Sequence, residues 1–252
     1  MPPASTPSKD KRSRPVKVAE AIKDWVVEQH LQAGDRLPSE PEMIERFGMA
    51  KSTIREAMRI LEAQGLVKTR TGPGGGSFVH EVSEERARAL LGNYFYFKDL
   101  TIADIYQLRR ALEPELAASL AGTLSETVLT QLEDTVAAYA EPAKTVDEER
   151  EQHVASLRFH AILAQQSNND LLGFLIRFMA NMLSDLTVYR QLYAPPNYEL
   201  WAKGKDYQQR LIKALRYGKA DEARKIMLDH MTTAQSLMES QEAEVARKFI
   251  PE

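Results

Sequence analysis

LPSEPEMIERFGMAKSTIREAMRILEAQGL, residues 37–66, is the stretch that decides the fold of the N-terminal part of the chain. Ser39 and Glu42 have the spacing of a capping box, which predicts the start of a short helix, and Gly48 is suited to end that helix in a left-handed conformation. A second helix is predicted to follow within a few residues and to end at Gly65. Two helices joined by so short a turn are typical of a helix-turn-helix.

The second of these helices has two distinct faces. Its apolar residues recur at the i, i+3, i+4 and i+7 spacing that places them together on the side of a core, namely Ile54, Ala57, Met58 and Leu61. Lys51, Arg55 and Arg59, spaced four residues apart, form a basic stripe on another side. A core-packed helix with a basic stripe is suited to enter a groove of double-stranded DNA, so we predict DNA as a partner.

A β-hairpin is predicted directly after the second helix. Residues 66–71 and 77–80 are β-like, and the glycine-rich run 72–76 between them forms the turn. In this position a hairpin acts as the wing of a winged helix-turn-helix, with a tip that approaches the sugar-phosphate backbone, and a flexible turn without a role is the alternative. A nucleotide phosphate-binding loop does not fit, because no Gly-Lys-Ser/Thr follows. An upstream helix from about Val16 to His30 supplies the third helix of a small core.

Composition and charge restrict the class of protein. The chain has 252 residues, of which 43% are hydrophobic, enough for one large domain or two small ones. The absence of cysteine fits a reducing compartment and excludes thiolate catalysis and cysteine metal sites. We recognise no signal peptide and no apolar run long enough to span a membrane, so we expect a cytoplasmic, nucleoid-associated protein without a membrane partner. The net charge is −3, but residues 1–80 hold 13 basic and 10 acidic residues.

The predicted organisation has four parts. Residues 1–14 form a disordered basic tail that either follows DNA phosphates or is simply solvated, and residues 15–80 form the winged helix-turn-helix domain. Residues 81–100 form a linker with a short helix. Residues 101–252 contain six consecutive amphipathic helices with short connections, which predicts an all-α bundle of six or seven helices. The predicted fold class is therefore mainly α, with a small β-hairpin wing.

These parts, in this order, resemble the GntR family of bacterial transcription regulators, in the FadR subfamily, which joins a winged helix-turn-helix to an all-helical FCD effector domain. In the N-terminal part, the resemblance rests on Gly34, Leu37-Pro38-Ser39-Glu40, Gly48, Arg55-Glu56-Ala57-Met58, Leu61 and Gly65-Leu66. In the C-terminal part, it rests on Arg109, Leu112-Glu113, Phe159-His160, Asn169, Met227 and His230. The resemblance implies a homodimer that binds a palindromic operator, and a regulator rather than an enzyme.

The expected DNA contacts lie in the recognition helix, at the start of the preceding helix and in the wing. They are Ser39, Lys51, Ser52, Thr53, Arg55, Arg59, Arg70, Gly72, Gly74 and Gly75. Two positions depart from the family pattern, because Pro41 replaces the usual arginine and Ala50-Lys51 replaces the usual Ser-Arg pair. Lysine cannot make the two-pronged contact of arginine with guanine, so we expect an operator different from the common family one.

The resemblance also implies a ligand site in the bundle. Many FCD domains bind a divalent metal through one Asp and three His, and the matching positions here are Ser156, His160, Gln208 and His230. Only His160 and His230 remain as metal ligands, so we expect no required cofactor, and a divalent metal at this degenerate site is the alternative. The same four residues and Arg109 are predicted to line a polar effector pocket. For Arg109, a bound carboxylate and a structural ion pair with a bundle glutamate both remain open, and each histidine can instead be a hydrogen-bonded core residue.

The leading hypothesis is a ligand-responsive repressor controlled by a small organic acid or a related metabolite. Two alternatives belong to other classes of protein. In the first, the protein binds DNA and its bundle serves only to dimerise. In the second, the protein is an enzyme that uses His160 and His230 as acid-base or metal groups, and the lack of a recognisable set of nucleophile, base and orienting residue counts against it.

Overall fold

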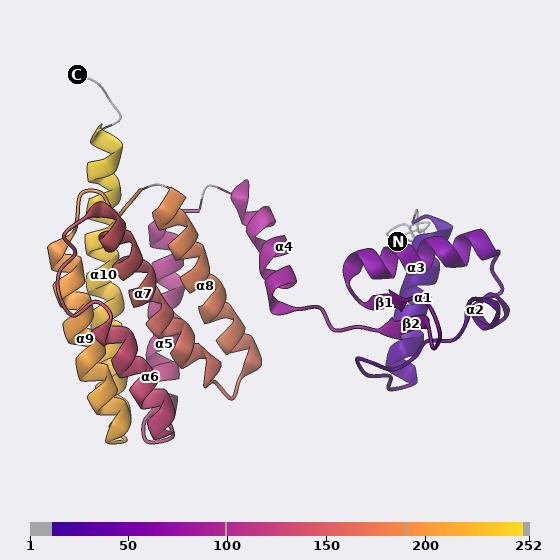
Figure 1. Cartoon of the computed structure of the whole chain (residues 1–252), viewed down its shortest axis with the longest axis horizontal. Helices are drawn as coiled ribbons and strands as arrows, with labels where there is room; N and C mark the ends of the chain where they lie inside the picture. The colour runs from indigo at the N-terminus through magenta and orange to yellow at the C-terminus, as the bar shows by residue number, and fades with distance from the viewer. Residues whose placement is uncertain (1–11, 99, 190, 249–252) are drawn as a thin grey trace, which may run out of the picture. The chain divides into compact units, whose positions relative to one another are not determined.

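The computed structural model describes residues 12–98, 100–189 and 191–248 (Figure 1). The chain divides into two compact units, and the boundary lies between Ala87 and Arg88, inside helix α4 (Glu84–Tyr96). Each unit has a core of its own. The mainly helical fold class predicted from the sequence is confirmed.

The N-terminal unit is a winged helix-turn-helix. Its elements are α1 (Arg14–Glu28), α2 (Glu40–Phe47), α3 (Lys51–Gln64), β1 (Val67–Arg70) and β2 (Gly76–Val79). The two strands are antiparallel and pair Val67 with Val79. The carboxylate of Glu42 accepts hydrogen bonds from the backbone N–H and the hydroxyl of Ser39, each with a length of 2.7 Å, as the capping box predicts. Gly48 and Gly65 follow α2 and α3 in the left-handed conformation.

Helix α1 begins earlier than the sequence suggested. Its first residue is Arg14, which the sequence analysis placed in the basic tail, and Pro15 in the first turn has the backbone angle that a helix start requires. Residues 1–11 of the predicted tail lie outside the described residues. Val18, Ala19 and Ile22 of α1 are buried against the core of the unit, so α1 is the third helix that the helix-turn-helix needs.

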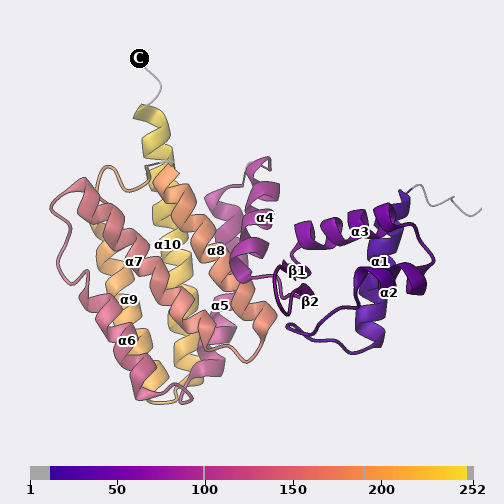
Figure 2. The same ribbon diagram turned by 45° about the vertical axis from the view of Figure 1, so that its right-hand side comes forward.

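The C-terminal unit is a helical bundle. After α4 it contains α5 (Ile102–Leu120), α6 (Glu126–Ala137), α7 (Val146–Gln165), α8 (Asp170–Tyr189), α9 (Tyr198–Arg216) and α10 (Ala220–Lys248). Helix α10 packs along α5 and α9, while α7 packs along α8 and α6 (Figures 1 and 2). Capping residues begin several of these helices, because Thr101 and Thr145 each accept a hydrogen bond from the backbone N–H three residues on. The predicted all-α bundle is thus present.

Helix α8 is more apolar than the sequence analysis allowed. By length and composition alone, its stretch Asp170–Val188, with a mean hydropathy of 1.4, would suffice to cross a membrane. In the structure, the inner side of α8 packs in the core of the bundle, where Ile176 and Leu183 are fully buried. On its outer side, Leu171 and Leu175 remain exposed.

Candidate functional site

The recognition helix α3 presents its basic stripe to solvent. Lys51, Arg55 and Arg59 are exposed, while Ile54 and Leu61 on the other side are buried in the core. Ser52 in the first turn is exposed and Thr53 is half-buried. Residue Ala50 precedes the helix and offers no side chain to cap it. The N–H of Thr53 donates to the carbonyl of Ala50 at 2.9 Å, and the other backbone N–H groups at the start of the helix can contact a phosphate oxygen.

Glu40, at the start of α2, pairs with two of these cations. Its carboxylate lies 2.6 Å from Arg55 Nε and 3.2 Å from Lys51 Nζ. The hydrogen bond from Arg55 is the main cause that lowers the pKa of Glu40. Because both cations are exposed, the pairs add little to folding stability, and their effect is to hold the two basic side chains together. This role of Glu40 is not apparent from the sequence, because the pairing joins two helices.

The wing is a tight turn with a defined conformation. Gly72 and Gly74 have φ angles of 91° and 76°, which only glycine adopts without strain. A Cβ atom on Gly75 would lie 2.6 Å from the carbonyl oxygen of Arg70, so this position has no room for a side chain. The guanidinium of Arg70 lies over the ring of Phe78, with its Cζ 4.6 Å from the ring centroid. The turn thus carries a basic side chain next to an exposed backbone.

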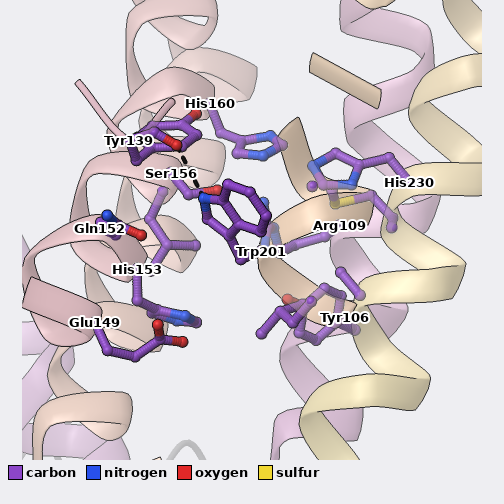
Figure 3. A pocket seen from close by; sticks show the side chains of 15 residues that line it. Tyr106, Arg109, Tyr139, Glu149, Gln152, His153, Ser156, His160, Trp201 and His230 are labelled. Carbon is purple, nitrogen blue, oxygen red and sulfur yellow. Dashed lines mark hydrogen bonds between the residues drawn. The ribbon is translucent and has the colours of Figure 1, made fainter. Parts of the chain in front are cut away.

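A pocket lies inside the bundle between α5, α7, α9 and α10 (Figure 3). The space open to the centre of a water-sized sphere is about 50 Å³, room for about four water molecules, since one needs roughly 10–15 Å³ by this measure. A compact ligand of several non-hydrogen atoms therefore suits it. The lining residues are Tyr106, Arg109, Tyr139, Glu149, Gln152, His153, Ser156, Leu157, His160, Leu200, Trp201, Gly204, His230, Met231 and Ala234.

Arg109 belongs to a buried network of charged and polar side chains at the inner wall of the pocket. Its Nε lies 2.5 Å from one carboxylate oxygen of Glu113, and Nδ1 of His160 lies 2.5 Å from the other. Burial opposes the charge of Glu113, but the attraction of Arg109 prevails and lowers the pKa of Glu113 to about 2. Of the two roles expected for Arg109, the structural ion pair with a bundle glutamate is therefore present, with Glu113 as the partner. Its Nη2 nevertheless has no hydrogen-bond partner, which leaves a donor for a ligand.

Ser156, Gln208 and Tyr139 form a hydrogen-bonded group where two of the family's metal ligands would lie. The amide nitrogen of Gln208 donates to the hydroxyl and the backbone carbonyl of Ser156, over 3.2 and 3.1 Å. The amide oxygen of Gln208 accepts from the hydroxyl of Tyr139. Gln208 is fully buried and braces Ser156 rather than lining the pocket itself.

These contacts do not fit a divalent metal. Both the oxygen and the nitrogen of the Gln208 amide are hydrogen-bonded, and a serine hydroxyl is a weak ligand, so of these four positions only His160 and His230 remain as metal ligands. Their rings stack with centroids 5.3 Å apart. In the part of the chain that the structure describes, no three His, Asp or Glu side chains are grouped to hold an ion.

Burial disfavours the charged form of the histidines in the pocket. Burial is the main cause that lowers the pKa values of His153, His160 and His230, and the pKa of His153 falls to about 4. Nε2 of His230 has no hydrogen-bond partner. The pocket thus offers polar imidazoles beside the guanidinium of Arg109, and burial disfavours a positive charge on them.

Several pocket residues escaped the sequence analysis, although a signal was present for those on α7. Glu149, His153, Ser156 and His160 are spaced by four, three and four residues, which places them on one side of a helix. Glu113 lies four residues after Arg109 and on the same side of α5. Tyr139 and Trp201 gave no such signal. They meet because the indole N–H of Trp201 donates to the backbone carbonyl of Tyr139 over 2.9 Å.

Comparison with known proteins gives the family of both units. Residues 16–79 match the bacterial regulatory proteins of the gntR family, and residues 104–233 match the FCD domain. The chain is 28% identical over 180 residues to the Glc operon transcriptional activator of Escherichia coli, covering 69% of each protein. It is 24% identical over 209 residues to the HTH-type transcriptional regulator LutR of Bacillus subtilis, covering 82% of this chain and 93% of LutR.

A solved structure supports the fold. The chain resembles Streptococcus agalactiae GntR with a TM-score of 0.59 and 22% identity, over 88% of this chain and 99% of that one. The matched proteins and families regulate transcription and are not enzymes, which argues against the catalytic hypothesis. The chain belongs to the GntR family of DNA-binding transcription regulators and carries a C-terminal FCD domain, the combination typical of FadR-like members.

Proposed function

We propose that this protein is a cytoplasmic, nucleoid-associated repressor that binds a palindromic operator as a homodimer and responds to a small organic acid. The exposed stripe of Lys51, Arg55 and Arg59, together with the uncapped start of α3, supports insertion of α3 into a major groove. A single recognition helix makes few base contacts, and a two-fold pair doubles them on a palindromic site.

The observation that carries the effector role is the unpaired Nη2 of Arg109 in a pocket inside the bundle that has both polar and apolar walls. Arg109 is 1% exposed, its Nη2 has no hydrogen-bond partner, and the residue lines the cavity together with His230. A buried donor without a partner is costly, and a ligand carboxylate or hydroxyl oxygen would satisfy it. The pocket size favours a compact acid, and the contacts of Ser156 and Gln208 favour binding without a metal.

The first test is whether ligand and DNA binding are coupled. Footprinting on the DNA upstream of the gene for this chain and of its neighbours would identify the operator. Small organic acids would then be screened by thermal shift, because a ligand that binds only the folded chain raises its melting temperature. We expect a stabilising acid to release the operator, which requires that it bind the DNA-free arrangement more tightly.

The same test separates this proposal from a bundle that serves only to dimerise. A bundle of that kind would bind the operator without being stabilised by any acid. Metal analysis of protein purified without chelator addresses the cofactor. Near-stoichiometric zinc, nickel or manganese, lost in His160→Ala, would contradict metal-free binding.

A further inference from the structure

On the side of the pocket opposite Arg109, two buried acceptor atoms have no hydrogen-bond partner among the described residues. Glu149 and Gln152 project from α7 across the cavity from Arg109 and His230 (Figure 3). Oε2 of Glu149 and Oε1 of Gln152 are buried and accept no hydrogen bond from the described residues. The two sides are therefore complementary, with an unpaired guanidinium donor and an unpaired imidazole nitrogen on one and two unpaired acceptors on the other.

The free oxygen of Glu149 is held in place by its neighbours. The other carboxylate oxygen accepts the backbone N–H of Asn197 at the start of α9, over 3.2 Å. The Asn197 side chain is fixed in turn by Gln241 of α10, over 3.3 Å. Glu149 is 6% exposed, so solvent does little to compensate the unpaired oxygen. The carboxylate is thus buried, oriented and incompletely satisfied.

The charges around the cavity are also unbalanced. Arg109 is already compensated by Glu113, and burial lowers the pKa values of the lining histidines. No cation among the described residues pairs with Glu149, and burial raises the pKa of Glu149. A plain carboxylate ligand would bring a further negative charge into a site that holds two carboxylates and one cation. A ligand that also carries a cationic group would remove this conflict.

We propose that the pocket binds a small zwitterion, an amino acid whose carboxylate accepts from Arg109 and His230 and whose ammonium group donates to Glu149 and Gln152. The proposal rests on the effector role proposed above and specifies the chemical class of the effector. The ammonium group supplies donors for the unpaired acceptors of Glu149 and Gln152, and the carboxylate supplies acceptors for the unpaired nitrogens of Arg109 and His230.

The test is a matched panel of small molecules measured on the full chain by isothermal titration calorimetry. The amino acids are glycine, alanine, β-alanine and γ-aminobutyrate. Each is compared with the acid that lacks the amino group, with the amine that lacks the carboxylate, and, for glycine and alanine, with glycolate and lactate. We expect the best amino acid to bind about ten- to a hundredfold more tightly than its deaminated acid, the range of one charged hydrogen bond.

Glu149→Gln tests the residue that carries the proposal. The variant keeps an oxygen for the Asn197 N–H and removes the charge. We expect about a tenfold loss of affinity for the amino acid and an equal or higher affinity for the plain acid. Glu151→Gln is the matched control, because Glu151 lies on the same helix and is exposed. Circular dichroism would verify that both variants are folded.

The outcomes separate this proposal from the one on which it rests. If plain or hydroxy acids bind as tightly as their amino counterparts, or Glu149→Gln leaves the amino acid affinity unchanged, the zwitterion is wrong and the effector role stands. If no compound of any class binds at millimolar concentration, both the zwitterion and the proposed acid-responsive role are contradicted.

Discussion

At the scale of single residues, the pocket depends on one position without a side chain. A Cβ atom added to Gly204 would lie 3.9 Å from His230 Cε1 and 4.0 Å from Ser156 Oγ, which are ordinary van der Waals distances. An alanine therefore fits without displacing its neighbours, but its methyl group occupies space that the ligand needs.

We predict that Gly204→Ala makes the ligand-free protein more stable by about 0.5–1 kcal/mol, since alanine is favoured over glycine inside a helix. The same variant should weaken binding of the amino acid panel. Urea unfolding and calorimetry would measure the two effects. Gly173→Ala is the contrasting variant, because its Cβ atom would lie 2.7 Å from the backbone oxygen of Ala164. Equal destabilisation of both variants would contradict the packing described for Gly204.

The pKa of Glu113 gives a prediction for acid. Its pKa is about 2 in the folded chain against an ordinary value of 4.5, so ionised Glu113 stabilises the folded state. This contribution is complete above about pH 4.5 and is lost as the pH falls towards 2. Glu113→Gln should therefore flatten the fall in unfolding free energy over this range. Glu133→Gln, at an exposed pair with Arg216, should change the profile little.

At the scale of elements, α3 carries the specific contacts with DNA. We predict that Arg55→Ala weakens operator binding by about 1–3 kcal/mol per half-site while the fold is retained. Gel shifts at fixed salt would measure the loss, and thermal unfolding would show that the core around Ile54 is intact. Arg210→Ala is the control, since it removes an exposed cation from α9. Unchanged operator affinity in folded Arg55→Ala would refute the role of the stripe.

The elements were largely predictable from the sequence, whereas the interior of the pocket was not. Capping residues and helix-ending glycines act within a few residues of one another, so Ser39, Gly48 and Gly65 could be interpreted locally. The pair of His160 with Glu113 joins α7 to α5, and the bond between Tyr139 and Gln208 joins residues 69 positions apart. Such contacts depend on how helices are packed, which periodicity alone does not specify.

At the scale of the whole molecule, the outer side of α8 is a candidate surface for contact between two copies of the chain. Leu171 is 66% exposed on a helix whose composition is otherwise that of a core helix. We predict that light scattering shows a homodimer with and without DNA. Replacing Leu171 and Leu175 together by glutamate should shift the protein towards a monomer with unchanged helical content, because each charge would be buried in the contact. A monomer in the unmodified protein would contradict the assembly, and a dimer that survives the double substitution would place the contact elsewhere.

The pairing of Glu40 with Arg55 and Lys51 has a consequence for how the protein searches a chromosome. In the free protein, Glu40 occupies two cations that would otherwise attract any phosphate. DNA of random sequence displaces the Glu40 carboxylate through contacts of its phosphate backbone alone. An operator also forms contacts with its bases, and these offset the loss of the ion pairs with Glu40. Glu40→Gln should therefore lengthen the residence time on random DNA more than on the operator. A residue that touches no base would in this way raise the ratio of specific to non-specific binding on which target finding depends.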